Sequence, residues 1–179
     1  MLFPISFAFI LYCVKRCPGA LLRTAPGTIG AAVRYRAGRI PTKTLKEQLF
    51  SFLPRLDAEA EAAVFWETHL EGIGAWYLAQ RRDDDLVLSA SPEFLLRPVA
   101  EKLGFRLIAT PMDPATGRIN GLNCHDAEKV RRFRAEYPGA RAEDFYSDSL
   151  SDTPMAELAQ RAFLVRKGRL APWPQRERR

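Results

Sequence analysis

Short apolar stretches alternate with helical patterns in the second half of the chain, and this alternation limits the possible folds. Strands are expected at residues 86–88, 105–110, 145–146 and 162–165, with helix-like segments between them. Ser91 is expected to cap the helix that follows the first strand, and residues 155–161 are expected to be helical. A turn at residues 113–117 predicts a hairpin over residues 105–123. Strands joined through helices pair in parallel, because each helix returns the chain to the same end of the sheet. The sequence therefore predicts an α/β fold with a parallel sheet.

The first half of the chain reads as helices with breaks, and no strand pattern precedes residue 86. Residues 1–14 are almost wholly apolar and are followed by Lys15 and Arg16, whereas a signal peptide carries its positive charge before the apolar run. The run is also short for a membrane span. We expect a buried amphipathic helix within a helical subdomain, with a membrane anchor as the alternative.

The composition favours an anionic partner without identifying it. The chain has 179 residues, a net charge of +6 and an isoelectric point near 9.5, which suits phosphate esters, nucleic acid or anionic lipid. No reader motif or interleaving of aromatic and basic residues supports nucleic-acid binding. An odd count of three cysteines without a framework spacing indicates reduced thiols and the cytoplasm. Residues 175–179 are expected to form a disordered basic tail.

Two carboxylates follow the strand expected at residues 145–146. Asp148 and Asp152 are four residues apart on a loop that leads into a helix, at the end of a strand where open α/β sheets bind ligands. Nearby carboxylates repel each other unless a cation or a proton joins them. Mg²⁺ uses few protein carboxylates and leaves room for phosphate oxygens. The pair predicts a Mg²⁺ site, and the alternative is a solvated loop that caps a helix.

Two more polar residues occur at expected strand and helix ends. Ser89 follows the strand at 86–88 and precedes a helix, where a hydroxyl and free backbone N–H groups can hold a phosphoryl oxygen. Lys129 lies near a helix start, where it can neutralise phosphate and a carboxylate. Taken singly, each reads more simply as a turn serine and a solvated lysine. The order serine, lysine and aspartate pair at successive strand ends is much harder to obtain by chance.

Residues 86–166 resemble the haloacid dehalogenase superfamily of phosphohydrolases, and more narrowly its phosphoserine-phosphatase-like branch, subfamily IB. The resemblance implies a Rossmann-like three-layer sandwich at residues 81–174 with a helical cap at residues 1–80. It also implies that Ser89 and Lys129 are catalytic and that Asp148 and Asp152 hold Mg²⁺. The phosphoryl group would be bound by Ser89, Ala90 and Lys129.

One part of the family pattern is missing. Members begin with a strand that ends in Asp-x-Asp, which supplies the nucleophile and the central strand, and no such stretch precedes the cap here. Asp83 and Asp85 match the pattern as text but come before their strand, so we reject them. The resemblance implies hydrolysis of a small phosphorylated metabolite through an aspartyl-phosphate. The alternative is a catalytically dead, truncated chain that binds phosphate or a partner, so enzymatic activity stays open.

Overall fold

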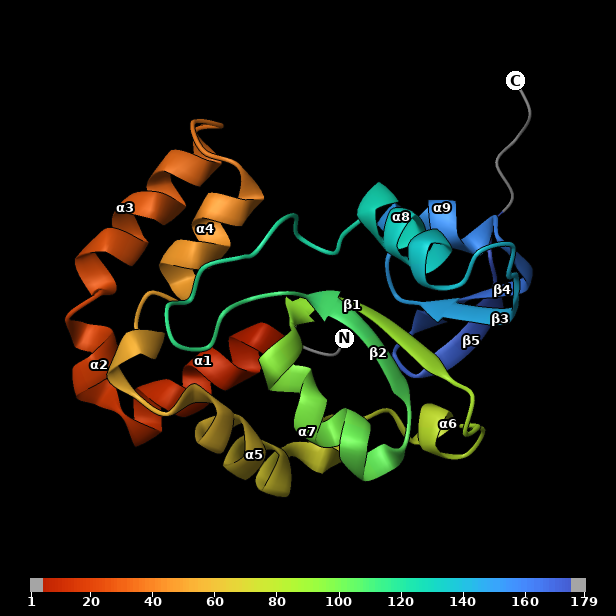
Figure 1. Cartoon of the computed structure of the whole chain (residues 1–179), viewed down its shortest axis with the longest axis horizontal. Coiled ribbons are helices and arrows are strands. Elements are labelled where there is room, and N and C mark those ends of the chain that lie inside the picture. Colours follow the sequence, from red (N-terminus) through yellow and green to blue (C-terminus); the bar gives the residue numbers. More distant parts are fainter. Residues whose placement is uncertain (1–4, 175–179) are drawn as a thin grey trace.

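Helices make up the first part of the chain, and strands begin at residue 86 (Figure 1). The computed structural model describes residues 5–174, so the predictions for the first four residues and for the tail at 175–179 lie outside the described part. The helices of the first part are α1 (Ile5–Arg16), α2 (Pro18–Leu22), α3 (Ala25–Arg36), α4 (Thr42–Leu49), α5 (Ala58–His69) and α6 (Ala75–Leu78).

Helix α1 packs one face into the protein core. Phe9 and Cys13 are one helical turn apart and fully buried, which is the spacing of an amphipathic helix. The ring of Phe9 meets those of Phe65 on α5 and Phe94 on α7 (Glu93–Leu103), with centroids 5.5 and 6.1 Å apart. The expected buried amphipathic helix is therefore present from Ile5 onward. Within residues 5–174 no helix is both long and apolar enough to cross a membrane.

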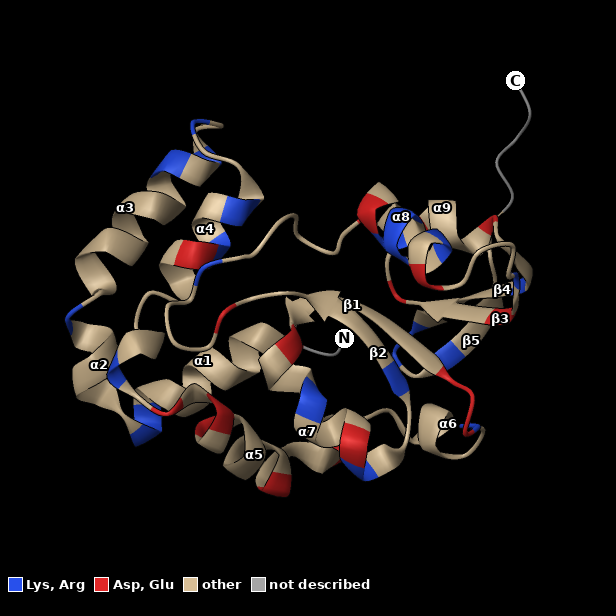
Figure 2. Cartoon of the chain, viewed as in Figure 1, with Lys and Arg blue, Asp and Glu red and all other residues tan. Residues whose placement is uncertain are grey.

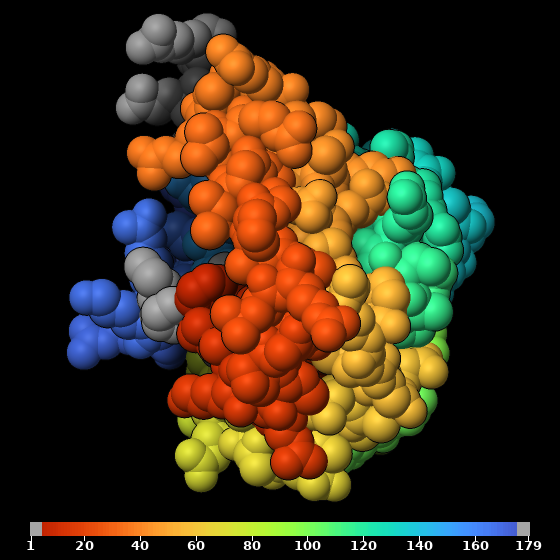
Figure 3. Space-filling model, turned by 90° about the vertical axis from the view of Figure 1, so that its left-hand side faces the viewer, coloured from red at the N-terminus to blue at the C-terminus, as the bar shows by residue number. Residues whose placement is uncertain are grey.

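Helices α1 to α3 form the outer face of the helical part (Figure 3). Several large apolar side chains stay exposed there, among them Leu22, Ile29 and Val33. The opposite side of this part packs on the strand-containing half through one continuous hydrophobic cluster that includes Phe65 and Leu95. The region predicted to form the cap is helical between Ile5 and Leu78, but its core is shared with the segment that follows.

The second part has the predicted strand and helix alternation, with parallel pairing. Strand β1 pairs with β2, and β3 with β4, both in parallel, whereas β5 is antiparallel to β4. In Figure 1, α7 lies below β1 and β2, and α8 and α9 lie above β3 to β5. The elements are β1 (Leu86–Pro92), α7 (Glu93–Leu103), β2 (Arg106–Thr110), α8 (Ala127–Glu136), β3 (Ala142–Ser147), α9 (Thr153–Ala156), β4 (Ala159–Arg166) and β5 (Arg169–Pro172).

The described strands form two separate sheets, one of β1 and β2 and the other of β3, β4 and β5. An ion pair of 2.8 Å joins Arg82, just before β1, to Glu143 at the start of β3. The two strands therefore begin at the same end of the molecule. Within residues 5–174 no strand hydrogen-bonds both β1 and β3, so each of them presents an edge without a strand partner.

Three local predictions were wrong. Ser91 does not cap α7, because β1 continues to Pro92 and the Ser91 hydroxyl instead accepts a hydrogen bond from Ser6. The helix expected at residues 155–161 ends at Ala156, because the chain is needed from Ala159 for pairing with β3. The hairpin expected at residues 105–123 is reduced to one bridge between Met112 and Ile119.

The loop that replaces the expected hairpin connects the two parts of the protein. It leaves β2, passes beside α4 and returns to α8 (Figure 1). Lys43 of α4 donates to the carbonyl oxygen of Gly121 at 2.8 Å, and Glu47 accepts the backbone N–H of Ile119 at 3.0 Å. Gly117 lies against the backbone of Phe50 at a positive φ of 70°. The residues that would have paired as a hairpin are therefore used to hold α4.

Candidate phosphate and metal site

One cavity contains all the predicted site residues. Its volume is about 840 Å³, and residues of both β1 and β3 line it. The polar groups expected from the sequence come from β1, from the start of α8 and from the residues that follow β3. The lining includes Ser89, Ala90, Lys129, Asp148 and Asp152.

Ser89 and Ala90 lie where β1 departs from regular pairing. Ser89 is level with Ala109 of β2, but the next paired residue is Pro92, so the two residues between them bulge out of the ladder. The Ser89 hydroxyl oxygen accepts the backbone N–H of Ser91 at 3.1 Å, which tightens this turn. Bulges bend a strand and re-aim its groups, and they are common beside active sites. The bulge therefore places Ser89 and Ala90 at the wall of the cavity.

Lys129 and Asp152 form a buried ion pair. The Lys129 Nζ donates to both carboxylate oxygens of Asp152, at 2.8 and 2.7 Å, and the side chains are 10% and 7% exposed. The hydroxyl of Ser147 donates to the same carboxylate at 2.7 Å. The structure therefore brings two predicted residues together, with the charge of each balanced by the other.

Asp148 is in a different environment from Asp152. It is exposed, lines the cavity and has no hydrogen bond or ion pair with any other residue that the structure describes. Residues 5–174 contain no cluster of three or more histidine, cysteine, aspartate or glutamate side chains that could hold a metal. One free and one paired carboxylate nevertheless suit Mg²⁺, which is bound through one or two carboxylates together with waters and substrate phosphates. The residues present are compatible with such an ion.

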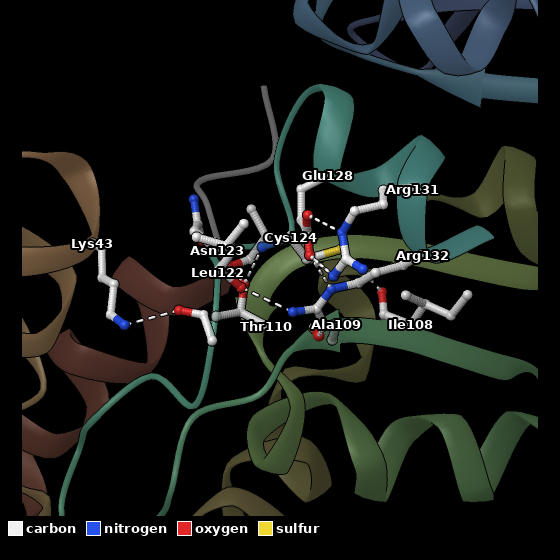
Figure 4. Close-up of polar contacts among 12 residues, drawn as sticks. Lys43, Ile108, Ala109, Thr110, Leu122, Asn123, Cys124, Glu128, Arg131 and Arg132 are labelled. Carbon is white, nitrogen blue, oxygen red and sulfur yellow. Dashed lines mark hydrogen bonds and ion pairs between the residues drawn. The ribbon is translucent and has the colours of Figure 1, made fainter. Parts of the chain in front are cut away.

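Glu128 fixes the helix that carries Lys129 (Figure 4). Its buried carboxylate accepts hydrogen bonds from Arg131 at 2.7 and 2.6 Å and from Arg132 at 2.8 Å. These bonds, those of Arg131 foremost, lower the pKa of Glu128 to about 2. Arg132 also donates to the carbonyl oxygens of Ala109, on β2, and Leu122, in the loop, at 2.8 and 2.9 Å. The start of α8 is thereby tied to the end of β2.

The other end of the cavity is also charged but contains none of the predicted site residues. The acidic turn before β1 is visible in Figure 2, and two of its residues, Asp84 and Asp85, line the cavity. The Asp85 carboxylate accepts the backbone N–H of Arg82 at 3.0 Å. Because residues 86–88 of β1 lie between Asp85 and Ser89, roughly 13 Å of extended chain separates these two residues, and Asp83 is farther away still. The rejection of Asp83 and Asp85 as nucleophiles agrees with this placement.

Sequence reasoning missed Lys46 of α4. Its Nζ donates to the carbonyl oxygen of Ala90 at 2.7 Å and to Oδ1 of Asn123 at 2.6 Å. Thr110 at the end of β2 donates to the same two acceptors. No local pattern links Lys46 to Ala90, which is 44 residues away, so only the packing of α4 on the loop could have revealed it.

Comparison with known proteins agrees with this geometry. The profile of the haloacid dehalogenase-like hydrolases matches residues 4–157. The chain belongs to this family. A search of curated proteins gives no significant match. A crystal structure described as a protein of unknown function from Bordetella pertussis Tohama I is similar, with a TM-score of 0.63 and 22% identity over 89% of this chain and 81% of that chain.

The two findings support different statements about this haloacid dehalogenase-like hydrolase. The profile covers the helical part and the segment that carries Ser89, Lys129, Asp148 and Asp152, so the family assignment applies to most of the chain. The similarity to the Bordetella protein supports the mixed α/β fold alone. Membership of this family is thus established, and catalytic activity, substrate and cofactor are matters for proposal.

Proposed function

We propose that this hydrolase acts on a small phosphomonoester through an aspartyl-phosphate intermediate, with Mg²⁺ as cofactor. One observation carries the proposal. Three segments that are far apart in sequence bring Ser89, Lys129 and the pair Asp148 and Asp152 to the same cavity. A hydroxyl, an ammonium group and a cation-binding carboxylate are the groups that phosphoryl transfer needs for positioning and charge stabilisation.

Each group has a role that follows from its surroundings. The Ser89 hydroxyl and the backbone N–H of Ala90 would hold two phosphoryl oxygens at the bulge of β1. The Lys129 ammonium would donate a hydrogen bond to the phosphoryl group while it stays paired with Asp152. Asp148, which is exposed in the cavity, and Asp152 would hold Mg²⁺, which offsets negative charge on the phosphoryl oxygens.

We assign the nucleophile to no residue within 5–174. At this end of the cavity the carboxylates are Asp148 and Asp152, both proposed for the metal, and Asp152 is also paired with Lys129. The facing edges of β1 and β3 suit an additional parallel strand, which would pair with both at the usual spacing of about 4.8 Å. A carboxylate at its end would attack phosphorus, displace the alcohol and form the acyl phosphate that water then hydrolyses.

The second candidate is a protein that binds phosphate, or a partner, without turnover. It is favoured by the closed pair of Lys129 and Asp152, which leaves neither side chain in need of a ligand. Both candidates share the phosphate site, and they differ in whether an attacking carboxylate reaches it. The same test can therefore separate them.

The test has a binding arm and a turnover arm. Wild-type protein should bind inorganic phosphate more tightly with Mg²⁺ than without it in an NMR titration, and Ser89→Ala should weaken binding at least tenfold. The matched control is Lys102→Met, an exposed lysine at the end of α7 that should leave binding unchanged. Equal binding by wild type and Ser89→Ala would reject the phosphate site.

For turnover, a segment of roughly 15 to 20 residues, enough for a strand and an Asp-x-Asp loop, is joined before the helical part. We expect Mg²⁺-dependent hydrolysis of an aryl phosphate by this form, and none by its Asn-x-Asn control or by the 179-residue chain. Phosphate binding without turnover in every form would favour the second candidate. Steady turnover by the 179-residue chain that is lost on Asp85→Asn would show that the nucleophile had been misplaced.

The same proposal includes the partners and the compartment. The cavity, with polar groups at both ends, is suited to a small phosphorylated metabolite rather than to nucleic acid or a membrane surface. All three cysteines are free, and Cys13 and Cys124 are buried, which supports the cytoplasm as the compartment. Protein isolated from cells and denatured in a thiol-alkylating reagent should carry three alkylated cysteines, and a disulfide would count against this placement.

A further inference from the structure

A polar cluster lies behind the bulge that carries Ser89 and Ala90, and it includes a lysine from the helical part. Its members are Lys46 from α4, Ala90 from β1, Thr110 from β2 and Asn123 from the loop. Thr110 is fully buried, and Lys46, Ala90 and Asn123 are half-buried. Residues from four separate segments therefore meet next to the proposed phosphate site.

Counting donors shows that this cluster depends on Lys46. The Ala90 carbonyl oxygen is 2.7 Å from the Lys46 Nζ and 2.8 Å from the Thr110 hydroxyl, and Oδ1 of Asn123 is 2.6 and 3.0 Å from the same groups. The Thr110 hydroxyl has one proton for two acceptors. Lys46 can donate to both acceptors at once and still has a third N–H. Without Lys46, the Thr110 hydroxyl could satisfy only one of the two acceptors, and either the Ala90 carbonyl or Oδ1 of Asn123 would be left without a donor.

The electrostatic environment of Lys46 favours an anion nearby. Burial, the main cause, lowers the pKa of the Lys46 ammonium to about 8, and the charge of Lys129 acts in the same direction. At neutral pH the group is still mostly protonated. Two positive charges thus act on each other across the end of β1, and a phosphate bound at Ser89 and Ala90 would relieve their repulsion.

Lys46 is also held in place by its helix. Neighbouring residues of α4 contact the same loop, because Lys43 donates to Gly121 at 2.8 Å and Glu47 accepts from Ile119 at 3.0 Å. A shift of α4 would therefore move Lys46 together with the loop that holds Asn123. Lys46 does not line the cavity, so its effect on a ligand there would pass through Ala90.

We propose that Lys46 is a positioning residue that couples α4 to the phosphate site. By holding the Ala90 carbonyl it fixes the bulge whose other groups bind phosphate, so phosphate binding and the docking of α4 stabilise each other. This inference rests on the phosphate site of the proposed function. Such coupling is reciprocal, because a ligand that tightens one contact is itself bound more tightly when that contact is formed.

The first test compares affinities for inorganic phosphate. We expect Lys46→Met to weaken binding about tenfold, which corresponds to about 1.4 kcal/mol, and Lys46→Arg to recover part of the loss. Lys102→Met is the matched control, since Lys102 is an exposed lysine at the end of α7 and takes no part in the docking of α4, and it should bind within twofold of wild type. Unchanged affinity in a folded Lys46→Met variant would overturn the inference.

The second test needs no variant and so does not depend on whether Lys46→Met folds. Hydrogen exchange of the wild-type protein should slow in α4 when phosphate binds, although α4 does not line the cavity. Protection of the Ser89 and Ala90 segment without protection of α4 would refute the coupling and leave the phosphate site intact. Absence of phosphate binding by wild type would reject both the coupling and the proposed function.

Discussion

The buried pair of Lys129 and Asp152 gives a quantitative test of the proposed site. Replacing Lys129 by methionine keeps the size of the side chain but removes its charge. Asp152 would then be left as a buried carboxylate with Ser147 as its hydrogen-bond donor at 2.7 Å. A buried charge that has lost its partner is among the most costly changes to a protein core.

The expected size follows from the contacts. Lys129 gives two hydrogen bonds to a charged acceptor, at 2.8 and 2.7 Å, and bonds of this type contribute about 1.5–3 kcal/mol each. Breaking a buried pair by removing one partner costs about 3–5 kcal/mol. We therefore expect Lys129→Met to lower the free energy of unfolding by about 3–5 kcal/mol, and Asp152→Leu to do likewise. The double variant should lie within about 1 kcal/mol of wild type, because an apolar pair replaces an ionic one.

The measurement is urea unfolding followed by circular dichroism at neutral pH, for wild type, both single variants and the double variant. Lys102→Met, at an exposed position, should change stability by less than about 0.5 kcal/mol. If the two single effects add in the double variant, the side chains do not act as a pair and the geometric reasoning is wrong. A stable double variant that no longer binds phosphate would indicate that the pair is retained for function rather than for stability.

Three further predictions concern the surroundings of the site. Because the pKa of Glu128 is lowered to about 2, its contribution is complete above its ordinary value near 4.5 and is lost as the pH falls toward 2. Glu128→Gln should therefore lower the free energy of unfolding by about 1–2 kcal/mol at pH 7, after allowing for the exposure of its arginine partner. This difference in stability between wild type and variant should disappear as the pH is lowered toward 2 in an acid titration. Gly117→Ala should destabilise by about 2 kcal/mol or more in thermal melts, since Gly117 has a positive φ and its new methyl group would collide with the carbonyl of Phe50, whereas Gly104→Ala, in open space, should cost about 1 kcal/mol. Asp148→Asn should abolish any rise in melting temperature caused by Mg²⁺, and an unchanged Mg²⁺ response would remove Asp148 from the metal site.

Much of the α/β part could be predicted because its signals are local. The apolar stretch before Ser89, the positive-φ glycine at Gly104 that ends α7, and the charged helix around Lys129 are each defined within about ten residues. The convergence of Ser89, Lys129 and Asp152 also followed from the sequence, since parallel strands bring their carboxyl ends to one edge of a sheet.

The remaining features depend on contacts between distant segments. The helix that begins at Thr153 is short because Ala159 pairs with Ala142. Helical propensity alone does not predict this competition between helix and strand. Ile119 reads as part of a hairpin, but its N–H is taken by Glu47. The sequence also places Asp152 beside Asp148 as a metal ligand, whereas its carboxylate is already paired with Lys129, which is 23 residues away.

The separation into two sheets has a consequence for how the chain acquires its structure. β1, α7 and β2 form one continuous segment, and β3, α9 and β4 form another, so each pair of parallel strands is closed by a single crossover. Contacts between residues near in sequence form quickly, because little loop entropy is lost in closing them. Each segment can therefore assemble as its own cooperative unit. The slow step should then be the docking of α1 and α5 on α7, which brings segments far apart in the sequence, such as those of Phe9 and Phe94, into one core.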